Sequence, residues 1–211
     1  MMKKLLCLLM ALLLSLGALT SCRGEPSAEE KEIMTETFLE LLEKSKQVND
    51  LLFGEGILPK EGGVALGAYT EADPDSLDFY GVTDIPSVKA RIREVYSLSI
   101  SAWIESTLLS SSKDAETGTV LTYARYYTGK TDPANKEEKE IFFVYTDYKA
   151  TVGKVSYSDV SLIECTKTGA KFSLTVTVTH EGEERSFSDT LMMVKESDGW
   201  RLDAPSYATY E

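Results

Sequence analysis

The sequence predicts an α+β fold, in which N-terminal helices pack on a curved, mostly antiparallel sheet of about five or six strands. Two patterns support this prediction. In three stretches between residues 28 and 109, apolar side chains recur every three or four positions, which is typical of amphipathic helices. After Gly118, β-branched and aromatic residues dominate, as in strands. We expect residues 28–211 to form a single domain.

The longest predicted helix runs from about Ala28 to Leu52. Ser27 and Glu30 have the spacing of a capping box, which satisfies free backbone N–H groups at a helix start. Its apolar stripe consists of Met34, Phe38, Leu41, Val48 and Leu52. A second helix is predicted over residues 86–96 behind a capping Asp84, and a third in the segment SAWIESTLL. The glycine-rich stretch from 53 to 80 is expected to form a loop.

Five later segments predict strands: TVLTYARYY, EIFFVYTDY, KVSYSDVSLIE, AKFSLTVTVTH and RSFSDTLMMVKE. In the fourth, Phe172, Leu174, Val176 and Val178 alternate with polar residues, so one face is expected to be buried. Glu181-Gly182 and Asp198-Gly199 predict tight hairpins. The segment WRLDAPSY is expected to close the sheet, with Trp200 in the core.

The first 21 residues have the features of an export signal. A basic start precedes an apolar run of about fifteen residues, whereas a membrane span needs roughly twenty. The segment LTSC that follows resembles the lipobox of bacterial lipoproteins, in which the cysteine is lipidated and becomes the mature N-terminus. We therefore expect residues 1–21 to be a signal peptide, Cys22 to carry the lipid and residues 22–27 to form a tether. A plain signal peptide cleaved nearby is the alternative.

These features predict a domain outside the cytoplasm, anchored to the bacterial membrane by lipid. Cleavage before Cys22 leaves 190 of the 211 residues and removes two lysines but no acid, so the formal net charge changes from −12 to −14. A domain with this much negative charge repels the phosphates of nucleic acid. We therefore exclude nucleic acid as a partner. Cationic protein partners gain in encounter rate. The alternative is that the acidity only keeps the protein soluble.

The sequence offers little for catalysis. Beside Cys22 the mature chain has one thiol, Cys165, so no disulfide within the domain is expected. With a single histidine, His180, a transition-metal site lacks ligands, and we expect no metal and no cofactor. Cys165 would need His180 as a base to become a nucleophile, but a buried cysteine at a strand end and a solvated turn histidine fit better. We predict that the protein is not an enzyme and has no catalytic residues.

The segment TDPANKEEKE is the predicted partner-binding loop. Its proline, alanine and asparagine mark it as a loop, while Asp132, Glu137, Glu138 and Glu140 concentrate acidic charge there. Exposed carboxylates accelerate the encounter with a basic protein surface. A loop that is merely solvated is the alternative.

Three segments, LLFGEGILP, FYGVTDIPSVKARIREVYS and TLMMVKESDGWRLD, are similar to the DL-endopeptidase inhibitor family, whose members restrain cell-wall autolysins. The resemblance implies a non-catalytic surface protein that binds a peptidoglycan endopeptidase and blocks its active-site groove. A basic cell-wall hydrolase would suit the acidic domain.

The order of elements and the closing GW-x-L strand also resemble NTF2-like domains. This second resemblance implies a small-molecule-binding module of the cell envelope. Tyr123 and Tyr127 on one strand face, with Tyr145 and Phe143 opposite, are candidates for the lining of such a pocket, although we interpret them mainly as core residues. A large apolar pocket holding an acid would favour this function, and a closed sheet with an exposed acidic loop would favour the inhibitor.

Overall fold

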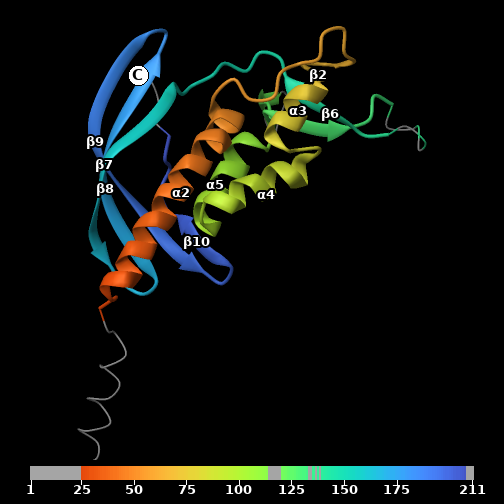
Figure 1. The fold of residues 1–211 in the computed structure, drawn as a ribbon. Helices are drawn as coiled ribbons and strands as arrows, with labels where there is room; N and C mark the ends of the chain where they lie inside the picture. Colours follow the sequence, from red (N-terminus) through yellow and green to blue (C-terminus); the bar gives the residue numbers. More distant parts are fainter. Residues whose placement is uncertain (1–24, 114–119, 133–134, 136, 138, 208–211) are drawn as a thin grey trace, which may run out of the picture.

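The computed structural model describes residues 25–113, 120–132, 135, 137 and 139–207, and its architecture is α+β, as predicted (Figure 1). The predicted signal peptide, Cys22 and Glu138 lie outside these residues. The helices are α2 (Ala28–Phe53), α3 (Pro74–Tyr80), α4 (Ile85–Val95) and α5 (Leu98–Leu108). The strands are β1 (Ala65–Leu66), β2 (Tyr69–Glu71), β3 (Ser112–Lys113), β4 (Val120–Thr122), β5 (Tyr126–Gly129), β6 (Ile141–Tyr145), β7 (Lys154–Cys165), β8 (Gly169–His180), β9 (Glu183–Glu196) and β10 (Gly199–Leu202). Within the described residues, no helix combines the length and the apolar character that crossing a membrane requires.

The prediction of one sheet is wrong, because the strands form two four-stranded antiparallel sheets and a two-stranded ribbon. Their orders are β1-β2-β6-β5, β10-β9-β8-β7 and β3-β4. β1 and β2 come from the stretch for which the sequence predicts a loop. β2 pairs with β6, so that Tyr69 lies opposite Tyr145 and Glu71 opposite Phe143. β2 and β5 flank β6, and the long C-terminal strands β7–β10 form the second sheet.

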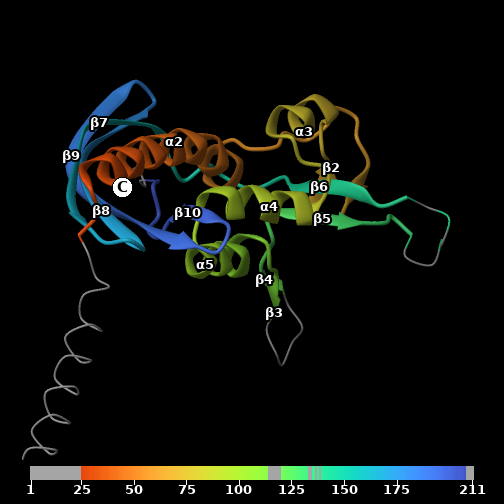
Figure 2. The same ribbon diagram turned by 60° about the horizontal axis from the view of Figure 1, so that its bottom comes forward.

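The second sheet curves around α2 (Figures 1 and 2). The predicted inner residues of β8 are buried: Phe172, Leu174, Val176 and Val178. The ring of Phe38 on α2 stacks on that of Phe172, with 3.9 Å between centroids and 5° between planes. A bulge with Asp159 at φ 53° interrupts the register of β7 and bends the strand. The concave face of this sheet is thus filled by α2.

The predicted starts of the first two helices are confirmed, whereas α5 begins at Leu98, three residues before the predicted segment SAWIESTLL. Ser27 Oγ accepts from the backbone N–H of Glu30 (3.2 Å), and the Glu30 carboxylate accepts from the N–H of Ser27 (2.7 Å). Asp84 caps α4 in the same reciprocal manner, with Ser87 as its partner. α3, which the sequence does not predict, begins at a capping Asp73 and has only seven residues. That length gives too few turns for an apolar period to stand out.

Both predicted hairpins are present. Glu181 and Gly182, at φ 50° and 88°, form the two-residue turn between β8 and β9, as a type I′ turn requires. In the next hairpin the turn is Ser197-Asp198 and not the predicted Asp198-Gly199, because Gly199 is the first residue of β10 and pairs with Glu196. Trp200 packs against the core but stays partly exposed, because β10 is an edge strand. Leu202, two residues later, is the fully buried residue of this strand.

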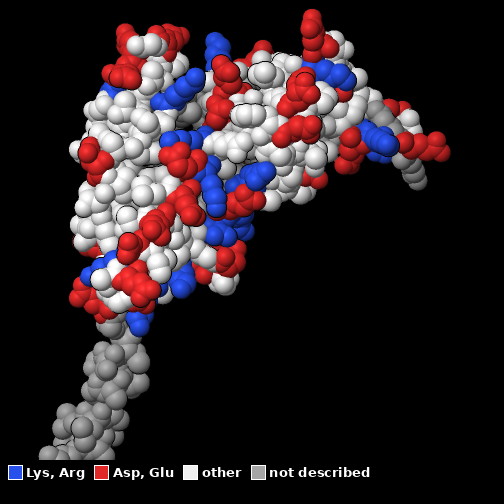
Figure 3. All heavy atoms as spheres, in the orientation of Figure 1, with Lys and Arg blue, Asp and Glu red and all other residues white. Residues whose placement is uncertain are grey.

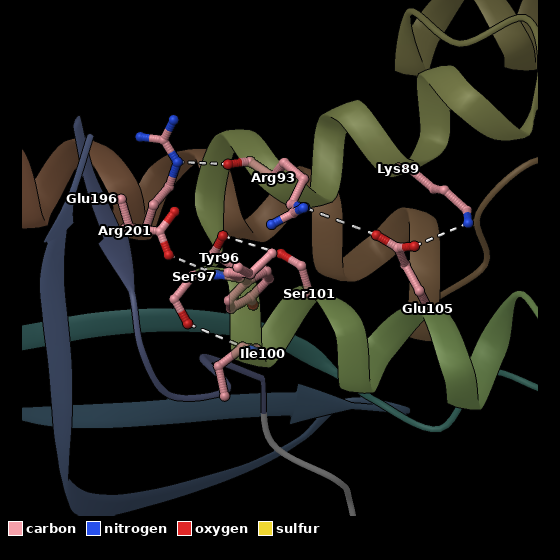
Figure 4. Close-up of polar contacts among 10 residues, drawn as sticks. Lys89, Arg93, Tyr96, Ser97, Ile100, Ser101, Glu105, Glu196 and Arg201 are labelled. Carbon is pink, nitrogen blue, oxygen red and sulfur yellow. Dashed lines mark hydrogen bonds and ion pairs between the residues drawn. The ribbon is translucent and has the colours of Figure 1, made fainter. Parts of the chain in front are cut away.

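The junction of α4 and α5 is tied to the second sheet (Figure 4). Arg201 Nε on β10 donates to the carbonyl oxygen of Arg93 (2.6 Å). The Glu196 carboxylate on β9 accepts from the N–H of Leu98 at the start of α5 (2.7 Å). Ser97 donates its backbone N–H to the carbonyl of Leu202 (2.8 Å). These bonds fix the α4–α5 junction against β9 and β10 of the second sheet.

A buried polar cluster joins α2, α4 and the C-terminal segment. The Tyr96 side chain is fully buried, and its hydroxyl donates to Asn49 Oδ1 (2.6 Å) and lies 2.7 Å from Ser206 Oγ. Burial raises the pKa of Tyr96, so the hydroxyl remains protonated and acts as a donor.

Tyr96→Phe should therefore lower the free energy of unfolding by about 1–3 kcal/mol, because Asn49 and Ser206 each lose a buried partner while the ring packing is kept. Urea denaturation measures the loss. Tyr127→Phe removes a hydroxyl from a residue that is 43% exposed, and should cost less than about 0.5 kcal/mol. Equal costs for the two variants would contradict the assigned role of Tyr96.

Candidate functional site: an acidic groove between α3 and the second sheet

A groove of about 1120 Å³ lies between α3 and the second sheet, at the C-terminal end of α2. Its floor is the last turns of α2 and the following Gly54–Gly56. One wall is α3, and the other is the start of β7 together with the β8–β9 turn. Figure 3 shows acidic side chains on both sides of this hollow.

The groove carries a negative charge. Its lining contains the five carboxylates of Asp50, Glu55, Asp73, Asp75 and Glu181, against the two amines of Lys46 and Lys154. Like charges on facing walls reinforce the potential in the space between them, and low-dielectric walls focus it. The groove therefore attracts a cationic ligand or a basic protein segment.

Asp50 is held in place at the floor. The Tyr80 hydroxyl donates a short hydrogen bond to Asp50 Oδ2. Burial raises the pKa of Tyr80, and the neighbouring Asp50 carboxylate raises it further, so Tyr80 stays a donor. Asp73 is held by its role as cap of α3, where it accepts from the N–H of Ser76 (2.9 Å). Two of the five carboxylates are thus fixed by the fold.

Exposed apolar side chains lie among these acids. Phe79 on α3 is 67% exposed, and Leu58 in the loop after α2 is 51% exposed; both line the groove. The backbone of Phe79 is tied to α2, because Gln47 Nε2 donates to its carbonyl oxygen (3.0 Å). Exposed apolar side chains on a rigid element, with polar groups around them, offer a contact surface that a partner protein can bury.

Arg125 fixes the loop that forms the floor. Its side chain is buried, with 3% exposed, and Nη2 donates to the carbonyl oxygens of Gly54 (2.7 Å) and Glu55 (2.8 Å). Gly56, at φ 62°, lies directly against this guanidinium. The loop Gly54–Gly56, called the GEG loop below, thus closes around Arg125, and its glycines allow the backbone to come close to the guanidinium.

The structure does not bring the predicted partner-binding residues to the groove. Asp132, Glu137 and Glu140 are exposed in the β5–β6 connection, which lies at the end of that hairpin away from the second sheet (Figures 1 and 2). Glu138 lies outside the described residues. The segment TDPANKEEKE also contains two lysines, and Lys130 directly precedes it, so the formal charge of residues 130–140 is only −1. Its attraction for a basic surface is therefore weaker than four carboxylates suggest.

The candidate thiol and base lie far apart. Cys165 ends β7 beside Ala170, near the start of β8, whereas His180 is the last residue of β8. Ten residues of strand separate Ala170 from His180, which corresponds to about 33 Å. Among the described residues, no group of three or more His, Cys, Asp or Glu side chains has the arrangement of a metal site.

The tyrosines form an exposed cluster instead of a core. Tyr123 is 41% exposed and Tyr127 43%, while Phe143 beneath them is fully buried. The ring of Tyr69 lies 5.9 Å from both exposed rings. Tyr123 and Tyr127 do not share a strand, because β4 ends at Thr122 and Tyr123 lies in the connection to β5. The interpretation as core residues is therefore wrong for Tyr123 and Tyr127 and confirmed for Phe143.

Sequence reasoning missed the residues that make the groove. Asp50 comes from a helix end and Phe79 from an unpredicted helix, and Arg125, which holds the floor loop from behind, lies just before β5. Only the folded chain brings them together. The sequence contains one indication of the groove. Two of the segments that resemble the inhibitor family, LLFGEGILP and FYGVTDIPSVKARIREVYS, contain the floor loop and Phe79. Comparison with models of known protein families and with curated proteins found no match.

Proposed function

We propose that this protein is a membrane-anchored, non-catalytic lipoprotein outside the cytoplasm that binds a basic peptidoglycan endopeptidase and blocks its active site. The observation that supports the proposal most strongly is the groove, in which exposed Phe79 and Leu58 are surrounded by five carboxylates. The carboxylates attract a basic partner protein. The apolar side chains then become buried in the interface, which displaces water from them.

The shape of the sheets gives less support to a small-molecule pocket of the NTF2-like kind. Such a pocket would use the concave face of the curved sheet. Here α2 fills that face, and Phe38 stacks on Phe172 at its centre. The groove lies outside the concavity, at the end of α2, and is open to a macromolecular partner.

The proposed anchor fits the position of the groove. α2 has 26 residues and rises by 1.5 Å per residue, so its ends lie about 39 Å apart. The groove uses the C-terminal end of α2, whereas Cys22 precedes the N-terminal end. A protein lipidated at Cys22 can therefore present the groove at a distance from the membrane surface.

Binding to the purified cell-wall endopeptidases of the same organism tests the apolar part of the proposal. Phe79→Ala should raise the Kd about tenfold or more, because the residue is the most exposed large apolar side chain of the groove. Leu98→Ala is the matched control: Leu98 is 57% exposed but does not line the groove, and its removal should leave the Kd unchanged. Equal effects of the two variants would exclude the groove as the binding site.

Association rates test the electrostatic part. The double change Glu55→Lys and Asp75→Lys reverses two exposed carboxylates of the groove and should slow association by about tenfold or more at low salt. Added salt should slow the wild type similarly, since screening acts over about 8 Å at physiological ionic strength. Glu137→Lys in the β5–β6 connection is the comparison. A larger effect of Glu137→Lys would place the contact at the predicted loop and contradict the groove.

A further inference from the structure

Four tyrosines lie together on one face of the first sheet. Tyr69 on β2 pairs with Tyr145 on β6. Tyr127 on β5 pairs with Phe143, which lies two residues before Tyr145 on β6. Paired residues, and residues two apart on a strand, point to the same face of a sheet. Tyr123 joins them from the connection between β4 and β5, because its ring stacks on that of Tyr145, with 4.9 Å between centroids and 13° between planes. We call Tyr69, Tyr123, Tyr127 and Tyr145 the tyrosine platform.

The rings of the platform are held in place, and two of them are well exposed. The Tyr69 hydroxyl donates to the carbonyl oxygen of Ala124 (2.9 Å). The Tyr127 ring crosses Gly129, two residues further along β5, and lies within 2.4 Å of the position that a Cβ would have there. Glycine thus lets this ring stay close to the sheet. Tyr123 and Tyr127 are the exposed members, and a ligand that contacts them orders little that is not already fixed.

The strands that carry the platform contribute almost no charge. β2, β5, β6 and residues 123–125 contain two charged residues, Arg125 and Glu71. The Arg125 side chain is buried against the GEG loop, and Glu71 is paired with Lys60 (2.7 Å). The chain as a whole has a formal net charge of −12. The platform therefore suits a neutral ligand, whereas the acidic groove suits a cationic one.

The exposed area of the platform is small. A fully exposed tyrosine offers about 250 Å² at most, so the four partly exposed rings together present less than about 400 Å². A standard protein interface takes about 800 Å² from each partner. The platform is thus too small to hold a folded protein or a second copy of this chain by itself. Ligand units about as large as its own rings fit it better.

We propose that the tyrosine platform binds a neutral polysaccharide chain, whose sugar rings stack on Tyr123 and Tyr127. The face of an aromatic ring carries a partial negative charge, and it attracts the C–H groups on the flat side of a pyranose ring. Phenol hydroxyls both donate and accept hydrogen bonds, as the hydroxyls of a sugar do. This site goes beyond the proposed inhibitor function, since none of the four tyrosines lines the groove and the ligand is uncharged.

Calorimetric titration of the full chain tests the proposal, with tri-N-acetylchitotriose and cellotriose as neutral probes. At least one of these sugars should bind with a Kd of about 1 mM or tighter. The tighter of the two shows whether the natural chain is N-acetylated. Hexaproline is the probe for a peptide, because aromatic surfaces also bind proline-rich segments. Absence of binding by both sugars, or tighter binding of hexaproline than of either, would overturn the proposal.

Variants locate the binding on the platform. Tyr127→Ala should raise the Kd for the sugar about tenfold or more, whereas Tyr127→Phe keeps the ring and should change it less than about threefold. Gly129→Ala leaves all four tyrosines in the chain but displaces the Tyr127 ring, so it should also weaken binding, and it remains informative if Tyr127→Ala fails to fold.

Trp103→Ala is the control. Trp103 on α5 is 46% exposed and is not part of the platform, so its removal should leave the Kd for the sugar unchanged. Equal effects of Trp103→Ala and Tyr127→Ala, or unchanged binding in both Tyr127→Ala and Gly129→Ala, would overturn the proposal.

Discussion

Phe38→Ala should lower the free energy of unfolding by about 3–5 kcal/mol, the largest effect that we expect from a single substitution in this chain. Phe38 is fully buried at the centre of α2, and its ring lies parallel to that of Phe172 at 3.9 Å. The change removes a large apolar surface from the core and leaves a cavity between the helix and β8, which the curved sheet cannot close. Urea or thermal denaturation measures the loss.

Leu39→Ala is the matched control. Leu39 is the next residue of the same helix and is 43% exposed, so its truncation leaves the core intact. We expect a change of less than about 0.5–1 kcal/mol, since alanine also favours the helix. If Phe38→Ala cost no more than Leu39→Ala, the packing of α2 in the concave face would be wrong.

Gly56→Ala should destabilise the protein by about 2 kcal/mol or more and should also disturb the floor of the groove. Gly56 has φ 62°, a conformation that costs a residue with a Cβ about 1–2 kcal/mol. An added Cβ would also lie 2.2 Å from Arg125 Nη2 and 2.4 Å from the hydroxyl of Tyr126. These groups hold the loop and the end of α2, so they cannot move away without losing their hydrogen bonds.

Gly62→Ala separates the two contributions. Gly62 has nearly the same backbone conformation, φ 66°, but nothing lies within 4 Å of the position of its missing Cβ. Its substitution should therefore cost only the backbone strain of about 1–2 kcal/mol. A smaller loss in Gly56→Ala than in Gly62→Ala would show that the loop is not packed around Arg125.

The sequence contains enough information for the fold class and for the longest elements. The capping box at Ser27, the stripe of α2 and the alternation along β8 each involve many residues in a regular period, so local pattern and tertiary packing agree. Short elements cannot be predicted in this way, because they contain too few residues to show a period. β1, β2 and α3 have two, three and seven residues, and they form because neighbouring elements offer them an edge or a face.

The groove is harder to predict because its residues are far apart in the sequence. Asp50, Phe79 and Glu181 become neighbours only once the two sheets are in place. Charge concentration in the sequence pointed to the β5–β6 connection, where lysines among the acids nearly cancel the charge. The position of Arg125 is also a tertiary property, since its partners are backbone carbonyls about seventy residues earlier.

The hydrolysis of peptidoglycan by the purified endopeptidases of the same organism tests the central claim most directly. The protein, added in slight molar excess, should slow the release of peptide fragments by at least one of these enzymes. The triple variant Glu55→Lys, Asp75→Lys, Phe79→Ala should lose this protection while unfolding at the same urea concentration as the wild type. Undiminished hydrolysis by every enzyme in the presence of the wild type, or full protection by the triple variant, would contradict the assignment of an inhibitory groove.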